Sequence, residues 1–184
     1  KGLMRYDTAS SKVQYCDGAA WGNVTGGSNI DDMSDGVYDA NGHLYLGDDA
    51  GASFTVGNDG NTGVGIGALS SGNSASYSTA FGALALNDGD ADANTAFGFH
   101  ALMGVTSGRM NVGLGREAIG GAGLNAAIGN TAAGDSAGYG LNGSSHNVAV
   151  GASTLSLSAG GEGNIAVGYG AMMQTGGGSY NIAI

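Results

Sequence analysis

Residues with the types and spacing needed for catalysis are scarce in this sequence. Gly134-Asp-Ser136-Ala-Gly138 matches the Gly-x-Ser-x-Gly pattern, in which a serine on a sharp turn acts as a nucleophile. That chemistry also needs an acidic residue and then a histidine after the serine, yet no aspartate follows Asp135. Because chance matches arise easily in a glycine-rich stretch, we expect a loop turn here and no enzymatic activity.

A second pattern, Gly138-Tyr-Gly140-Leu-Asn-Gly143, has the glycine spacing of a dinucleotide-binding turn. Such a turn follows a strand, opens a helix and is completed by an acidic residue about 20 positions later. No helix-favouring sequence surrounds it, so we expect no nucleotide cofactor.

One stretch carries alternating oxygen ligands of the kind that bind calcium. Asp88, Asp90 and Asp92 are separated by small residues, although Ala93 replaces the glycine of a calcium loop and no glutamate closes it. A solvated loop is the simpler interpretation, whereas three such loops gathered in a trimer would offer a Ca²⁺ site. The three histidines are widely spaced and predict no metal cage.

Several aromatic residues fall at or near expected turns, where a ring face could stack on a sugar. Packing at the edge of a repeat is the alternative explanation for them. The candidate receptor contacts are Tyr77, Phe99, Tyr139 and Tyr169, and Tyr180 has a similar position.

The composition restricts the elements that could position these residues. The chain has 184 residues with 39 Gly, no Pro, one Cys and a net charge of −10. So much glycine disfavours long helices, and the absence of a Gly-X-Y period and of proline excludes collagen. The acidic balance argues against a nucleic-acid partner, and no apolar run is long enough for membrane insertion.

A repeat of about 17 residues runs through most of the chain. Each unit has a polar residue, then apolar residues at alternate positions with Ala or Gly between them, then Gly; we align nine units, counting a truncated last one. The first begins at His43, and the others begin at Asn61, Ser78, Asn94, Asn111, Asn125, Asn147, Asn164 and Asn181.

This unit is too short for a helix pair or a propeller blade, and its alternation predicts a strand. A glycine turn and a second short strand should follow, so that stacked coils form a parallel β-roll or solenoid. The asparagine amides should then hydrogen-bond along the stack. We expect the face lined by Ala and Gly to be bare, so that other copies of the chain pack closely against it.

The chain divides into three parts on this pattern. Residues 1–27 lack the repeat and predict a small β-meander, with strands at 3–6, at 13–16 and near Trp21. Residues 28–42 form an acidic connector, and residues 43–184 form the β-roll of about nine coils. We therefore expect an all-β protein.

The Asn-x-Ala-aliphatic-Gly coils over residues 43–184 resemble the head repeats of trimeric autotransporter adhesins and similar arrays in bacteriophage tail fibres. The opening Gly2-Leu-Met-Arg-Tyr-Asp-Thr8 and the connector with Asp32-Met-Ser-Asp35 resemble modules of phage fibre proteins. The resemblance implies a left-handed parallel β-roll, three chains per rod and attachment to a host surface.

We therefore expect a non-enzymatic segment of a homotrimeric fibre, on a virion tail fibre or otherwise at a cell surface. Its partners would be its own copies, other fibre or virion proteins, and a glycan or protein of the host. A bacterial adhesin head and an architectural spacer without a receptor are the alternatives. A polysaccharide-cleaving spike is less consistent, because the repeats from residue 61 onward carry only six acidic residues, three of them in one loop.

Overall fold

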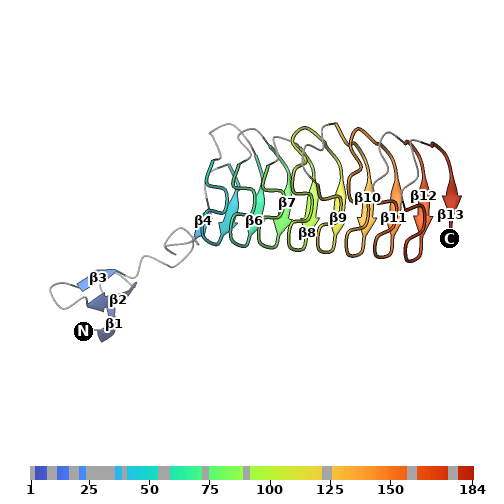
Figure 1. Cartoon of the computed structure of the whole chain (residues 1–184). Helices are drawn as coiled ribbons and strands as arrows, with labels where there is room; N and C mark the ends of the chain where they lie inside the picture. Colours follow the sequence, from blue (N-terminus) through green and yellow to red (C-terminus); the bar gives the residue numbers. More distant parts are fainter. Residues whose placement is uncertain are drawn as a thin grey trace.

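The computed structural model confirms an all-β protein with a parallel solenoid (Figure 1). Within the described residues, no helix could cross a lipid bilayer. The description covers residues 3–7, 12–16, 21–23, 36–38, 41–53, 59–71, 75–88, 92–121, 126–156, 161–173 and 178–184, with the backbone alone before residue 41.

A three-stranded antiparallel sheet forms the N-terminal meander. β1 (Leu3–Asp7) pairs with β2 (Lys12–Cys16), and β2 pairs with β3 (Trp21–Asn23). This arrangement confirms the meander predicted from the sequence.

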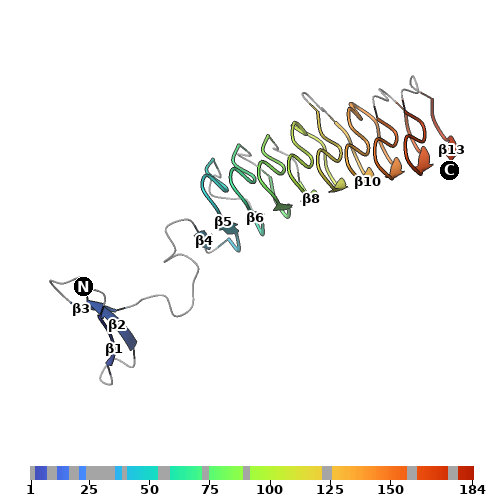
Figure 2. The same ribbon diagram turned by 60° about the horizontal axis from the view of Figure 1, so that its bottom comes forward.

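A ten-stranded sheet forms the solenoid. Its strands β5 to β13 follow one another in parallel, one strand per coil, and form a single row along the stack (Figure 2). β4 lies within the expected connector and pairs antiparallel with β5, so it covers the first edge of the parallel sheet. The strands are β4 (Gly36–Tyr38), β5 (Leu44–Leu46), β6 (Thr62–Val64), β7 (Thr79–Phe81), β8 (Thr95–Phe97), β9 (Val112–Leu114), β10 (Thr131–Ala133), β11 (Val148–Val150), β12 (Ile165–Val167) and β13 (Ile182–Ala183).

The register of β10 corrects one unit of the sequence repeat. Thr131 pairs with Val112 and Val148, so the unit begins at Asn130 and not at Asn125. Asn130 then lies 19 residues after Asn111 and 17 before Asn147, which removes the irregular spacing of the original alignment. Asn125-Ala-Ala-Ile-Gly129 matches the motif in sequence, but the strand that pairs with its neighbours begins after Asn130.

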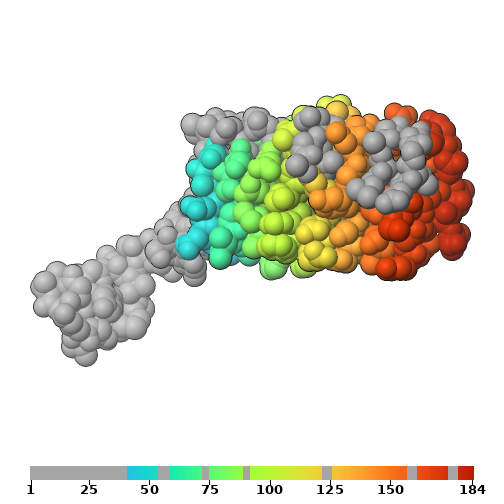
Figure 3. Space-filling model, in the orientation of Figure 1, coloured from blue at the N-terminus to red at the C-terminus, as the bar shows by residue number. Residues whose placement is uncertain are grey.

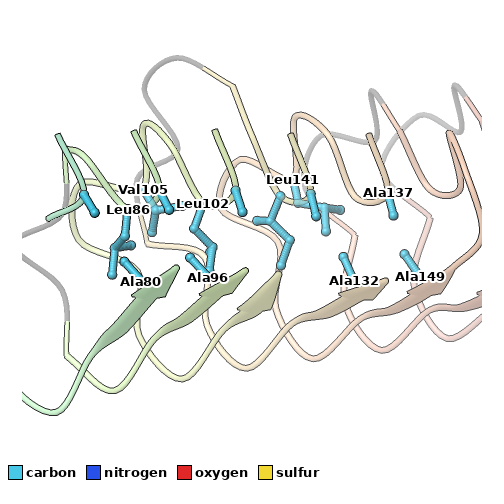
Figure 4. Close-up of a cluster of buried hydrophobic side chains, with 14 of the residues drawn as sticks. Ala80, Leu86, Ala96, Leu102, Val105, Ala132, Ala137, Leu141 and Ala149 are labelled. Atoms are coloured by element: carbon cyan, nitrogen blue, oxygen red, sulfur yellow. The ribbon is translucent and has the colours of Figure 1, made fainter. Parts of the chain in front are cut away.

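The expected orientation of the strand faces is wrong. The middle residue of the strand in each complete coil, which is Ala or Gly from β6 to β12, is buried inside the coil, and its two neighbours point outward. In Figure 4, Ala80 and Ala96 point toward Leu86 and Leu102, which come from the opposite wall. The small residues therefore form the interior of each coil and do not receive another chain.

The alanines face inward because each coil is flat and its two walls are close together. A Cβ added to Gly113 would lie 2.9 Å from the Ala118 carbonyl oxygen and 3.2 Å from Leu102 Cγ. An interior this thin accepts one large side chain per coil: it comes from the turn wall where the strand supplies Ala or Gly, and from the strand at Tyr45, where the wall supplies Gly51. The leucines at Leu69, Leu86 and Leu102 are fully buried and fill it.

The wall opposite the sheet is not the second strand that the sequence predicted. It is a run of turns in which residues such as Leu69, Leu86 and Leu102 have positive φ, between 48° and 55°. Backbone bonds still join successive coils here, for example from Leu86 N to the Ala101 carbonyl at 2.9 Å. Left-handed residues let the chain reverse twice within a few positions, which an extended strand cannot do.

The asparagine ladder is confirmed. Asn147 donates from its backbone N at 2.9 Å and from Nδ2 at 3.0 Å to Oδ1 of Asn130, in the preceding coil. Asn164 repeats both bonds to Asn147, at 2.9 and 3.1 Å. Ser78 interrupts the amides, and His43 Nδ1 takes the position in the first coil by accepting from Asn61 N at 3.1 Å. These buried bonds hold successive coils in register.

Candidate functional site

The most unusual surface of the solenoid is the outward side of the parallel sheet, which we call the outer face. It consists of the first and third residues of each strand from β5 to β13, and none of these strands contains a charged residue. Its members are Leu44, Leu46, Thr62, Val64, Thr79, Phe81, Thr95, Phe97, Val112, Leu114, Thr131, Ala133, Val148, Val150, Ile165, Val167 and Ile182.

Large apolar side chains on the outer face are open to solvent. Phe81 and Phe97 are 48% and 55% exposed, and their rings stack with centroids 4.9 Å apart. Leu114 and Val150 are 43% and 40% exposed. The stacked pair arises because parallel pairing in register places identical positions of adjacent coils beside each other.

The dimensions of the outer face suit a protein partner. Eight steps of about 4.8 Å between nine strands give a length of about 38 Å, and a three-residue strand gives a width of about 10 Å. The resulting flat area is roughly 400 Å² including its four threonines, and apolar patches of a few hundred Å² on monomers are often functional. Parallel sheets also occur almost only with both faces covered, and the coil covers one.

The serine of the Gly-x-Ser-x-Gly match lies in an ordinary coil turn. Ser136 has a φ of +53°, and the same turn position has +56° at His100, +54° at Glu117 and +54° at Ser153. The Ser136 hydroxyl donates to Glu117 Oε2 at 3.5 Å, so its neighbour is a carboxylate and not an imidazole. The left-handed backbone at this serine therefore follows from the solenoid, and its hydroxyl is bonded to Glu117 in place of the histidine that the nucleophile pattern requires.

The glycine-spaced stretch 138–143 is part of the wall. Gly138 N donates to the Thr154 carbonyl at 2.8 Å, and Leu141 is buried in the core. No helix follows Gly143 within residues 126–156, so the turn lacks the helix N-terminus that holds a pyrophosphate.

An exposed ion pair joins two coils on the edge where the chain leaves the sheet. Arg116 binds Asp135 through Nε at 2.7 Å and through Nη2 at 2.8 Å, and also contacts Glu117 at 3.0 Å. The hydrogen bond to Asp135 is the main cause that raises the pKa of Arg116, followed by the two carboxylate charges. Exposed pairs of this kind contribute little to stability.

The predicted calcium ligands are only partly described. Asp88 and Asp92 are exposed, Asp92 Oδ1 accepts a bond from Ser76 N at 2.8 Å, and Asp90 lies outside the described residues. Among described residues, no group of three acidic, histidine or cysteine side chains is placed to hold a metal. The Ca²⁺ site stays a prediction.

The four candidate receptor aromatics do not form one cluster. Tyr77 lies where the chain enters β7, whereas Phe99 and Tyr169 lie where it leaves β8 and β12. Tyr77, Phe99 and Tyr169 are 66%, 48% and 87% exposed, and Tyr139 is half-buried. The ring of Phe99 stacks on that of His100 at 3.8 Å.

Comparisons with protein-family models, curated proteins and solved structures gave no match.

The sequence contained the signal for the outer face, but we assigned it to the interior. Phe81 and Phe97 alternate with Ala80 and Ala96, and large apolar residues normally point inward. The leucine or isoleucine that follows most of these glycines indicated the correct orientation of the strand, because that side chain alone fills a coil this thin.

Proposed function

We propose that this chain is a non-enzymatic, rod-like segment of a homotrimeric fibre, similar to those of phage tails, that serves in attachment to a host surface. The observation that supports it is the uncharged, apolar outer face, which runs along all nine parallel strands.

A second copy of the chain is the partner that suits this face best. A partner must present an apolar surface as long as the stack, and another copy has one by construction. Closed symmetry among identical chains is also the commonest form of oligomer. The number of three chains comes from the resemblance to fibre and adhesin repeats.

Rigidity is the property that such a rod contributes. The asparagine ladder and the coil-to-coil backbone bonds satisfy polar groups within the stack. A stiff oligomer would hold its edges and loops away from the particle or cell that carries it, where they meet a host receptor.

The mass in solution tests the assembly. Light scattering on the full chain should give three times the chain mass of 17.8 kDa. Phe97→Asp places a charge in the outer face and should yield a folded monomer, because an unpaired charge is costly to bury. Met173→Asp, at an exposed position outside the strands, should leave the trimer intact.

Three results would argue against this proposal or narrow it. A monomeric wild-type chain, or a Phe97→Asp variant of unchanged mass, would contradict assembly through the outer face. Binding of the trimer to host cells distinguishes attachment from the alternative of a spacer, since an inert trimer supports the spacer alone.

A further inference from the structure

A row of exposed side chains follows the edge where the chain enters each strand. We call it the corner row: the residue just before the ladder position in each coil from β6 to β13. All its members have φ between 56° and 65°. Small and large residues alternate along it, in the order Gly60, Tyr77, Ala93, Met110, Gly129, His146, Gly163 and Tyr180.

The aromatic members of the corner row lie over glycines of the preceding coil. A Cβ built on Gly163 would be 2.8 Å from Cδ1 of Tyr180, and one on Gly60 would be 3.4 Å from Cδ1 of Tyr77. A Cβ on Gly129 would be 3.2 Å from His146 Cδ2. Each ring therefore has one side against a glycine, which fixes its position.

These rings are exposed although the backbone there favours glycine. Tyr77 and Tyr180 are 66% and 79% exposed, and Met110 is 53% exposed. A non-glycine residue at such a φ costs about 1–2 kcal/mol. The left-handed Leu69 and Leu86 offset that cost by complete burial, which the exposed tyrosines lack. The stacked coils impose this φ at every member of the row, Ala93 included, so the tyrosines are distinguished by their exposed rings and not by the backbone.

Hydrogen-bonding groups accompany the rings. The Tyr77 hydroxyl donates to Asp59 Oδ2 at 3.5 Å, and the residue before Tyr77 donates its N–H to Asp92 Oδ1. Near the other end, Glu162 N donates to Ser179 Oγ at 3.1 Å, next to Tyr180. A carboxylate acceptor thus lies beside Tyr77, and the residue bonded through its backbone next to Tyr180 is a glutamate.

The geometry points to a binding edge for an extended, neutral polysaccharide that runs along the stack. Large side chains recur every second coil, about 10 Å apart at the usual strand spacing, as a repeating polymer requires. C–H groups of sugar rings would pack on the faces of Tyr77 and Tyr180, and sugar hydroxyls would donate to Asp59 and Glu162.

The negative charge of the protein favours neutral polysaccharides over anionic ones. The chain carries a net charge of −10, and three carboxylates, Asp59, Asp92 and Glu162, directly precede members of the row against one cation, Arg109. Acidic polysaccharides would be repelled by this edge. The inference rests on the proposed attachment function and specifies the ligand class and the surface.

Affinity electrophoresis of the full chain tests this edge. The gels contain barley β-glucan, galactomannan, hydroxyethylcellulose or the polyanion alginate. At least one neutral polysaccharide should retard the protein, and Tyr77→Gly with Tyr180→Gly should weaken the apparent affinity about tenfold, equivalent to roughly 1.4 kcal/mol. Glycine suits the backbone at both positions, because Gly60 and Gly163 have the same φ. The single variants should each give part of the loss.

Ile66→Ala is the matched control, since Ile66 is 62% exposed, close to the exposure of Tyr77, but lies where the chain leaves β6, on the opposite edge. It should bind like the unmodified chain. The inference is overturned if no neutral polysaccharide retards the protein, if alginate alone does, or if the double variant binds unchanged while keeping its mass.

Failure of this inference leaves a separate readout for the proposed function. Trimers that adhere to host cells equally well before and after periodate oxidation of the cell-surface sugars would support attachment and overturn polysaccharide binding. Trimers that adhere to no cells would remove the attachment function itself.

Discussion

At the scale of single residues, the glycine after each strand sets how closely coils approach. Gly134 has a φ of +138°, and an added Cβ would lie 2.6 Å from the carbonyl carbon of Gly151 in the next coil. The same collision recurs at Gly98 and Gly115. Glycine is therefore required at these positions for two reasons: the backbone has a φ that other residues rarely adopt, and the adjacent coil leaves no space for a Cβ.

Gly134→Ala and Gly168→Ala separate these two requirements. Gly168 has a comparable φ of +114°, but nothing lies within 4 Å of its added Cβ. Gly168→Ala should cost about 1–3 kcal/mol of unfolding free energy through the backbone alone. Gly134→Ala should cost at least about 2 kcal/mol more, because the next coil must shift. Urea unfolding measures both, and equal losses would show that the contact between coils does not matter.

At the scale of the coil, the two faces of each short strand require side chains of different size. Its middle residue meets the leucine of the turn wall, so only a small side chain fits. Its outer residues contact their equivalents in adjacent coils, as Phe81 and Phe97 do, and leave their outward side open. The alternation of large and small residues thus records two different contacts, one within the coil and one on the outer face.

Adjacent substitutions in β8 should report this difference. Ala96 is fully buried, whereas Thr95 is exposed on the outer face. Ala96→Val overfills the interior and should destabilise the protein by about 1–3 kcal/mol. Thr95→Val should change stability by no more than about 0.5 kcal/mol. If thermal unfolding gave the reverse order, the assignment of the two faces would be wrong.

At the scale of the whole molecule, the hydrophobic core is a narrow row of buried side chains that runs along the stack. The coils form successive bands along the solenoid (Figure 3), and each packs a large apolar side chain of its own inside, such as Leu86, Ile119 or Leu155, while leaving the outer face open. An assembly through that face would be held by apolar contact, because its strands contain no charged residue.

The assembly should therefore resist salt and depend on concentration. Its mass should stay unchanged in 1 M NaCl, where the screening length falls to about 3 Å and surface ion pairs are weakened. Its melting temperature should rise with protein concentration, as expected when folding and association are coupled. Light scattering and calorimetry give the two readouts, and dissociation at high salt would indicate a polar interface elsewhere.

The sequence by itself determined the period, the sheet strand of every coil except that of β10, and the asparagine ladder. Each depends on local chemistry that recurs in every coil: a glycine that turns the chain, an amide that bonds to its equivalent and alternate apolar residues. The unit predicted to begin at Asn125 was wrong because two overlapping segments, starting at Asn125 and at Asn130, both match the repeat motif. Pairing of Thr131 with Val112 and Val148 distinguished them, and pairing involves residues from three coils.

Only the tertiary structure decided which strand face points inward. The alternation of large and small residues indicates that the two faces of the strand differ, but it does not indicate how much space each face has. That space depends on the distance to the turn wall, where left-handed Leu86 and Leu102 project into the coil. The corner row was hidden for the same reason: Tyr77 and Tyr180 align on one edge only after every coil has been stacked in register.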